Sequence, residues 1–117
     1  PKDSFGSDSV KMNWLTEAET AGVDELSTKE VHLVPIGDGR FVVLWNQIGW
    51  DWANGVGEIR RTRYAIVDGT GETVKGAADL GVPAPGHLDP LVLGNKMIWY
   101  VSQDGKTAFV TIDLTKL

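Results

Sequence analysis

The fold is decided by the stretch Ile36-Gly37-Asp38-Gly39-Arg40-Phe41-Val42-Val43-Leu44-Trp45, in which a glycine-rich turn separates two apolar segments. Glycine and aspartate tolerate the positive φ angles of tight hairpin turns. The run from Phe41 to Trp45 is short and rich in β-branched and aromatic residues, which favour strands. The stretch therefore predicts an antiparallel hairpin.

Three further segments repeat this pattern of short apolar runs, namely Tyr64–Val67, Met97–Val101 and Phe109–Ile112. Turn-forming residues lie between them, at Asp68–Gly71, Gly94-Asn95 and Asp104-Gly105. Successive strands joined by tight turns pair in antiparallel fashion. We therefore expect an all-β chain.

One segment hints at a helix. Thr16-Glu17-Ala18-Glu19 matches a capping box, and helix-forming residues continue toward Leu26. Gly22 and Val23 interrupt that pattern. A short helical turn and an acidic, solvated loop are therefore both open here.

The chain also contains an internal similarity. Ile36–Val43 aligns, with one gap, on Leu93–Trp99, and each segment is followed by a matching strand, Tyr64–Asp68 in one case and Phe109–Asp113 in the other. The 117 residues then form a single domain of two blade-like repeats, at about 30–80 and 88–117.

The first repeat has four expected strands and the second has three. The strands of the first are at 31–34, 41–45, 63–68 and 73–77, and those of the second are at 90–93, 97–101 and 108–114. The N-terminal segment 8–14 alternates Val10, Met12 and Trp14 on one face, and would complete the second blade. This layout predicts two four-stranded antiparallel β-propeller-like blades. Two blades do not close a ring, so the chain is expected to be a homo-oligomer, a part of a larger protein, or alternatively a small β-sandwich.

The amino-acid composition limits the classes of partner that the chain is expected to bind. Sixteen acidic residues against eleven basic ones leave a net charge of -5, which disfavours nucleic acid. The longest apolar runs are far shorter than the roughly 20 residues of a membrane helix, so no membrane insertion is expected. The chain has no cysteine and no motif for a metal, nucleotide or dinucleotide, so no cofactor and no metal are expected.

Several core and turn segments carry a family resemblance. They are Trp14–Thr16, His32–Val34, Gly39–Trp45, Tyr64–Gly71, Asp89–Val92, Trp99–Val101 and Thr111–Leu114. In these segments, which span most of residues 10–114, the sequence resembles the blade-type β repeats (β-propeller-like) of secreted and cell-surface proteins of Gram-positive bacteria. The resemblance implies an extracellular or cell-surface, non-catalytic β module. It offers no site residue, and the insert after Trp45 departs from its pattern.

The candidate site lies in that insert. Residues 46–62 form an expected long connection with two tryptophans, where the second repeat needs only 102–107, and long loops in compact domains are often functional. In a propeller this connection would share a face, and a pocket, with residues 81–87 and Trp14. The candidate ligand-binding residues are Trp50, Asp51, Trp52, Asn54, Arg60, Arg61, His87 and Trp14. Alternatively, Trp50 or Trp52 caps the core. Trp45 and Trp99 lie within apolar strands and are expected in the core.

Catalytic residues are harder to find. His32 and His87 are the two histidines, and His87 beside Asp89 is a weak catalytic candidate. Asp51 with Glu58, or Asp24 with Glu25, would be the carboxylates of a glycosidase, but acidic loop residues are usually only solvated. The favoured hypothesis is a non-catalytic module that recognises a carbohydrate through its aromatic loop, because indole faces stack on sugar rings. The alternative is a protein–protein interaction or structural module of a larger bacterial surface protein.

Overall fold

The computed structural model describes residues 15, 19–21, 24–86, 88–103 and 105–117, most of which lie in strands. The strands are β1 (Glu19–Ala21), β2 (Asp24–Gly37), β3 (Arg40–Asp51), β4 (Val56–Asp68), β5 (Thr73–Asp79), β6 (Leu91–Leu93), β7 (Lys96–Gln103) and β8 (Lys106–Asp113). A short 3₁₀ helix, η1 (Leu114–Lys116), follows β8. The prediction of an all-β chain is confirmed.

The strands form two antiparallel sheets. The first has the order β1-β2-β3-β4-β5, in which β1 pairs only with the beginning of β2. The second has the order β6-β7-β8. All seven strands expected between residues 31 and 114 are found where the apolar runs predict them. The strand expected at 8–14 lies outside the described residues, and the two sheets as described form no closed ring.

The turn between β2 and β3 shows why its residues are needed. Gly37, Asp38 and Gly39 all have positive φ angles, of 90°, 54° and 68°. Residues with a Cβ rarely adopt this left-handed region, and aspartate is among the few that do. Three such angles in succession reverse the chain in a tight turn, so that Gly37 pairs with Arg40.

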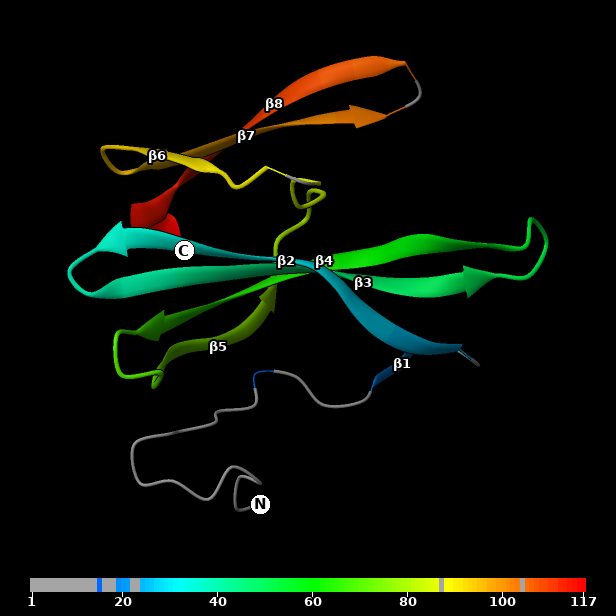
Figure 1. Cartoon of the computed structure of the whole chain (residues 1–117), viewed down its shortest axis with the longest axis horizontal. Coiled ribbons are helices and arrows are strands. Elements are labelled where there is room, and N and C mark those ends of the chain that lie inside the picture. The colour runs from blue at the N-terminus through cyan, green and yellow to red at the C-terminus, as the bar shows by residue number, and fades with distance from the viewer. Residues whose placement is uncertain (1–14, 16–18, 22–23, 87, 104) are drawn as a thin grey trace.

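The core lies between the two sheets, which are stacked in Figure 1. It combines Val34, Val42 and Leu44 of the first sheet with Met97 and Trp99 of the second. The connection from β5 to β6 contributes Ala84, and its Pro83 carbonyl accepts a hydrogen bond of 2.9 Å from the Trp99 indole nitrogen. The arrangement matches the sandwich alternative. Trp45 and Trp99 are both buried, as predicted.

Both alternatives near the N-terminus, the helical turn and the solvated loop, are wrong for the residues that the structure describes there. Glu19–Ala21 forms β1, and Asp24 already begins β2, with Glu19 opposite Leu26. Local helix propensity is a weak preference, and the backbone hydrogen bonds of an antiparallel pair override it here. Residues 16–18 and 22–23 lie outside the described part.

The expectation of a long loop at residues 46–62 is also wrong. β3 continues to Asp51, β4 begins at Val56, and only Trp52–Gly55 forms the turn between them. The glycines of this segment suggested a loop, but they lie in paired strand positions, Gly49 opposite Glu58 and Gly57 opposite Trp50. We call residues 47–60 the arm. It extends beyond the second sheet at one end of the molecule (Figure 1).

Candidate functional site

The tip of the arm is a turn built around Asp51. Its Oδ1 accepts hydrogen bonds from the backbone nitrogens of Ala53 (3.0 Å) and Asn54 (3.3 Å), and its Oδ2 accepts one from Asn54 Nδ2 (2.7 Å). Hydrogen bonding by the Asn54 side chain is the main cause that lowers the pKa of Asp51 below its usual 3.8. Asp51 and Asn54 therefore build the turn.

The two tryptophans of the arm are exposed. Trp50 retains 43% and Trp52 76% of its accessible surface, and neither belongs to the core cluster. Their ring centroids are 6.1 Å apart, with an angle of 74° between the planes, which is an edge-to-face contact. The alternative in which one of them caps the core is therefore not what the fold adopts.

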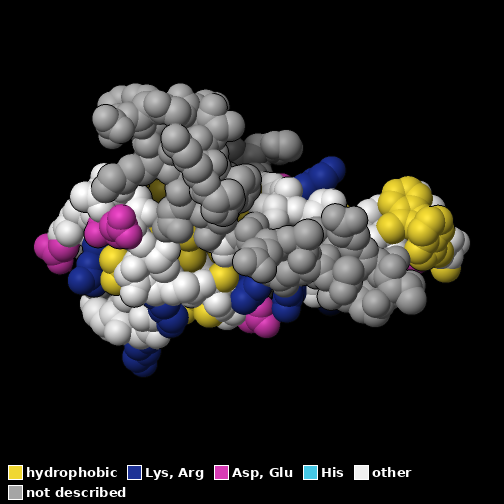
Figure 2. Space-filling model, turned by 90° about the horizontal axis from the view of Figure 1, so that it is seen from below, with side chains coloured by type: hydrophobic (Ala, Val, Ile, Leu, Met, Phe, Trp, Pro, Cys, Tyr) yellow, Lys and Arg dark blue, Asp and Glu magenta, His cyan; other side chains and the backbone are white. Residues whose placement is uncertain are grey.

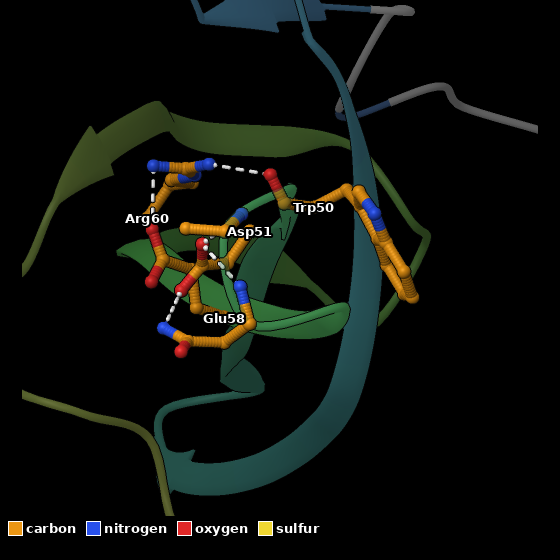
Figure 3. A network of polar contacts seen from close by, with 6 residues as sticks. Trp50, Asp51, Glu58 and Arg60 are labelled. Carbon is orange, nitrogen blue, oxygen red and sulfur yellow. Dashed lines mark hydrogen bonds and ion pairs between the residues drawn. The ribbon is translucent and has the colours of Figure 1, made fainter.

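Arg60 occupies a β-bulge at the base of the arm. Gln47 lies opposite Arg61 and Ile48 opposite Ile59, so Arg60 is the extra residue. Its Nη2 donates to the Trp50 carbonyl (2.9 Å) and its Nη1 lies 2.6 Å from Glu58 Oε1, as Figure 3 shows. The side chain crosses Gly49, where a Cβ atom would lie 2.9 Å from Arg60 Cγ.

Arg61 points to a different partner. Its Nε donates to Oε1 of Gln47, whose side chain is buried. The two arginines that the sequence places next to each other therefore have separate structural contacts. Both are held by groups of the arm itself.

The arm has two unlike faces. Ile48 and Trp50 are two residues apart on β3, with Ile59 directly opposite Ile48, so these three share one face. The other face carries Glu58 and Arg60 (Figure 3). In the space-filling view, hydrophobic side chains gather at the end of the molecule that the arm forms (Figure 2). The arm thus combines an apolar face and tip with a polar face whose charges are paired internally.

A buried polar network lies at the root of the arm, and the sequence did not indicate it. Asn46 is fully buried; its Oδ1 accepts from Thr62 Oγ1 (2.6 Å) and from the backbone nitrogen of Ala84 (3.3 Å). Its Nδ2 donates to Glu30 Oε1 (3.1 Å). These bonds attach the connection between the two sheets to strands β2, β3 and β4.

His32 makes a second attachment to that connection. Its Nδ1 lies 2.6 Å from Asp89 Oδ1, and its Nε2 lies 2.8 Å from the Pro85 carbonyl and 3.0 Å from the Gly86 carbonyl. The ring is buried. His32 therefore serves to hold the connection, as a structural histidine does.

A cleft of about 750 Å³ lies beside this network. It is lined by Glu30, Asn46, Ile59, Pro83, Ala84, Pro85, Gly86, Leu88, Asp89, Leu91, Ile98, Trp99, Tyr100, Val101, Ser102 and Phe109. Pro85 and Gly86 come from the connection that was expected to share a pocket with the arm. The tip residues Trp50, Asp51 and Trp52 do not line the cleft, and neither do Asn54, Arg60 and Arg61. His87 and Trp14 lie outside the described residues.

The sequence carried one signal for this cleft. In β7 the apolar residues do not alternate with polar ones: Met97 and Trp99 face the core, while Ile98 and Tyr100, on the opposite face, are also apolar. A strand that is apolar on both faces is expected to be covered on both. Tyr100 and its cross-strand partner Phe109 are instead 52% and 80% exposed.

Two of the carboxylates considered for catalysis have partners within the arm. In the part of the chain that the structure describes, no three His, Cys, Asp or Glu side chains are grouped as metal ligands. Of the carboxylates considered for hydrolysis, Asp51 builds the turn and Glu58 is paired with Arg60. Among the same described residues, no helix has the length and apolar character needed to cross a membrane.

Comparison with known proteins adds no relative from which a role could be transferred. No protein-family model, curated protein or solved structure matches the chain.

Proposed function

We propose that this chain is a non-catalytic binding module that inserts the aromatic tip of its arm into a protein partner. The observation that carries the proposal is the exposure of Trp50 (43%) and Trp52 (76%) at the end of a hairpin. Tryptophan is the residue type most enriched among those that dominate binding energies at protein interfaces. Ile59, which is 47% exposed and shares the face of Trp50, extends the apolar surface along the arm.

The rigidity of the tip supports this proposal. Asp51 ties the turn through three hydrogen bonds, and Arg60 ties β4 to the carbonyl of Trp50. A backbone that is already ordered loses less conformational freedom on binding. The turn therefore presents the two tryptophans on an ordered backbone.

The polar groups favour a protein over a sugar. Sugar recognition combines stacking with hydrogen bonds to hydroxyl groups, but Asp51, Asn54 and Arg60 direct their polar atoms to partners within the arm. The two indoles also stand at 74° to each other and form no common flat platform. Carbohydrate recognition is kept as the second candidate because the 76% exposure of Trp52 leaves a ring face on which one sugar could stack.

The blade interpretation belongs to the same proposal. Strands β2 to β5 form an antiparallel series in chain order, and β6 to β8 form a shorter one. Among the described strands β8 has a neighbour on one side only, and such edges are normally covered. We propose that the edge is completed by the N-terminal segment 8–14, by a second copy, or by an adjoining blade of a larger extracellular or cell-surface protein.

The test uses a peptide library displayed on phage, selected on the wild-type protein and counter-selected on the Trp50→Ala/Trp52→Ala variant. Val74→Ala is the control, because it removes an apolar side chain that is 45% exposed on β5, away from the arm. The proposal expects peptides that bind the wild type and the control but lose at least ten-fold in affinity for the double variant. Circular dichroism establishes that all three proteins are folded.

A parallel arm of the test uses insoluble cellulose, chitin and peptidoglycan in sedimentation assays. Polysaccharide binding that depends on Trp52 alone would transfer the assignment to the carbohydrate candidate. If neither peptides nor polysaccharides distinguish the wild type from the double variant, the arm is not a binding element and the proposal is wrong.

A further inference from the structure

Glu30 has an unusual backbone for a residue within a strand. Its φ angle is 55°, in the left-handed region, and it lies at a register shift of β2 between Lys29 and His32. A residue with a Cβ is strained in this conformation, and such strain persists only where the surrounding structure imposes it. Bulges of this kind redirect a side chain and are over-represented beside functional sites.

The strained position brings the Glu30 carboxylate to the cleft. Its Oε1 accepts a hydrogen bond from Asn46 Nδ2 (3.1 Å). The Asn46 amide cannot turn over without loss, because its Oδ1 already accepts from Thr62 and Ala84. Glu30 Oε2 faces Gly86, where a Cβ would lie 3.8 Å away. A fully buried amide therefore fixes one carboxylate oxygen, while the side chain itself lines the cleft.

The other walls of the cleft are mostly apolar. Leu88 and Leu91 are 65% and 63% exposed, and Tyr100 and Phe109 stand beside them on the face of the second sheet that points away from the core. Sites for small organic ligands have this composition, with apolar walls and a few placed polar groups, and volumes between about 300 and 1,000 Å³. The 750 Å³ of this cleft fall within that range.

The charged side chains described in the cleft wall are acidic. Among the lining residues that the structure describes, Glu30 and Asp89 are the carboxylates, and none is a Lys or an Arg. Asp89 is engaged by His32 at 2.6 Å, which leaves Glu30 as the carboxylate without a cationic partner among the lining residues. A ligand that matches this surface has an apolar body and one positive charge, because an opposite charge at close range compensates for desolvation.

We propose that the cleft binds a small organic amine with an apolar body, whose protonated nitrogen pairs with Glu30 while Leu88, Tyr100 and Phe109 enclose the rest. The protonated amine would supply a positively charged donor to the Glu30 carboxylate, whose Oε1 already accepts from the neutral Asn46 amide. This site is separate from the aromatic tip of the arm, and it stands whether or not the tip binds a protein.

The experiment compares three probes with the same phenyl-butyl body, namely 4-phenylbutylamine, 4-phenylbutanol and 4-phenylbutyrate. Isothermal titration calorimetry measures the affinities, and ¹H–¹⁵N correlation spectra locate the site. The amine is expected to bind at least ten-fold more tightly than the alcohol, and the carboxylate more weakly than both. Chemical-shift changes are expected at the amides of Ala84, Gly86 and Ser102.

Glu30→Gln tests the charge. The amide oxygen of glutamine can still accept from Asn46, so the network is kept while the charge is removed, and the amine should then bind no better than the alcohol. Glu72→Gln removes one charge from the turn between β4 and β5, outside the cleft, and should leave the ten-fold preference unchanged. The Trp50→Ala/Trp52→Ala variant should also bind the amine as the wild type does.

Glu30→Gly distinguishes a ligand-binding role from a structural one. Glycine adopts a φ of 55° without strain, but it also leaves the buried Asn46 Nδ2 without its acceptor, so these two effects oppose each other and the melting temperature should change little while the amine preference is lost. A fall in melting temperature with the preference intact would overturn the proposal. So would equal affinity for all three probes, shifts confined to other surfaces, or a dimer that covers Phe109 and excludes the amine.

Discussion

At the scale of single residues, Asp51, Glu58 and Arg60 make hydrogen bonds and an ion pair with other groups of the arm. Trp50 and Trp52 could be selected from the sequence as an aromatic pair in an insert, and their exposure agrees with that selection. The hydrogen bonds of Asp51 and the ion pair of Arg60 with Glu58 could not be selected. Both interactions depend on the turn and on the bulge. These two features bring the donors and acceptors together only when the hairpin forms.

Asn54→Ala is predicted to raise the pKa of Asp51 toward 3.8, since the Asn54 side chain is the main cause of its lowering. A carboxyl group whose pKa is lowered by folding stabilises the fold at pH values above the unfolded pKa. That contribution is lost as the pH falls through the lower, folded pKa. A ¹³C NMR titration of the Asp51 carboxyl group between pH 2 and 6 measures the shift.

The matched comparison for this titration is Arg60→Ala. The charge of Arg60 is the smallest of the causes that act on Asp51, so its removal should raise the pKa less than Asn54→Ala does. The reverse order would show that long-range charge, and not the turn, controls the carboxylate.

Gly49→Ala is predicted to destabilise the arm, although replacing a glycine in a strand usually does the opposite. The new Cβ would overlap the Arg60 side chain and displace it from Trp50 and Glu58. We expect a loss of about 1 kcal/mol in the free energy of unfolding, as for mild overpacking. Urea denaturation measures it.

The same substitution in an Arg60→Ala background completes a double-mutant cycle. With the arginine side chain gone there is nothing to overlap, so Gly49→Ala should cost nothing there. Equal costs in both backgrounds would contradict the contact.

At the scale of elements, strand positions could be predicted well and strand lengths could not. The apolar runs mark the centres of β3 and β4, but each strand extends several residues into polar, glycine-rich sequence. Pairing continues there because each strand supplies the backbone partners of the other, and the bulge at Arg60 absorbs the change of register. Residue propensities describe each strand without its partner, so the strand ends predicted from them lie too close to the apolar runs.

Gly55→Ala is predicted to loosen the arm. Gly55 has a φ of 67° in the turn, where an alanine is strained by roughly 1 kcal/mol. Amide hydrogen exchange within the arm, at Gly49 and Glu58, should become about five-fold faster. The amide of Val42 in the core should be unaffected.

Gly71→Ala is the control for that experiment. Gly71 also has a positive φ, of 85°, but it lies in the turn between β4 and β5. Its substitution should accelerate exchange in β5 and leave the arm unchanged. Faster exchange of the arm in both variants would mean that the arm opens only with the whole sheet.

At the scale of the whole molecule, the two sheets form one core through a small number of buried side chains. Met97 is completely buried and packs in the same cluster as Leu44 and Ile66 of the other sheet. The stacking could not be predicted from the strand pattern, because the residues that orient the second sheet are hydrogen-bond partners in the connection, such as His32 with Asp89. The hydrophobic pattern of the sequence carries no information on such a polar pair.

Met97→Ala is predicted to lower the free energy of unfolding by about 3 kcal/mol, as for other large buried apolar side chains. Methyl NMR signals of Val42 in the first sheet and Val110 in the second should disappear at the same urea concentration. Leu93→Ala, at a side chain 59% exposed, should cost at most about 0.5 kcal/mol. Two separate transitions would show that the sheets are independent units.

The position of Asn46 has a mechanical consequence. The arm is a paired hairpin with a bulge at its base, and its root is fixed where the buried Asn46 amide meets Thr62. We expect any bending of the arm to occur next to this point, because the bulge interrupts the regular pairing there. The same amide holds Glu30 on one side and the backbone of Ala84 on the other. The residues that fix the root of the arm are therefore also residues of the cleft wall, so a change of the arm's angle at its root would alter the cleft.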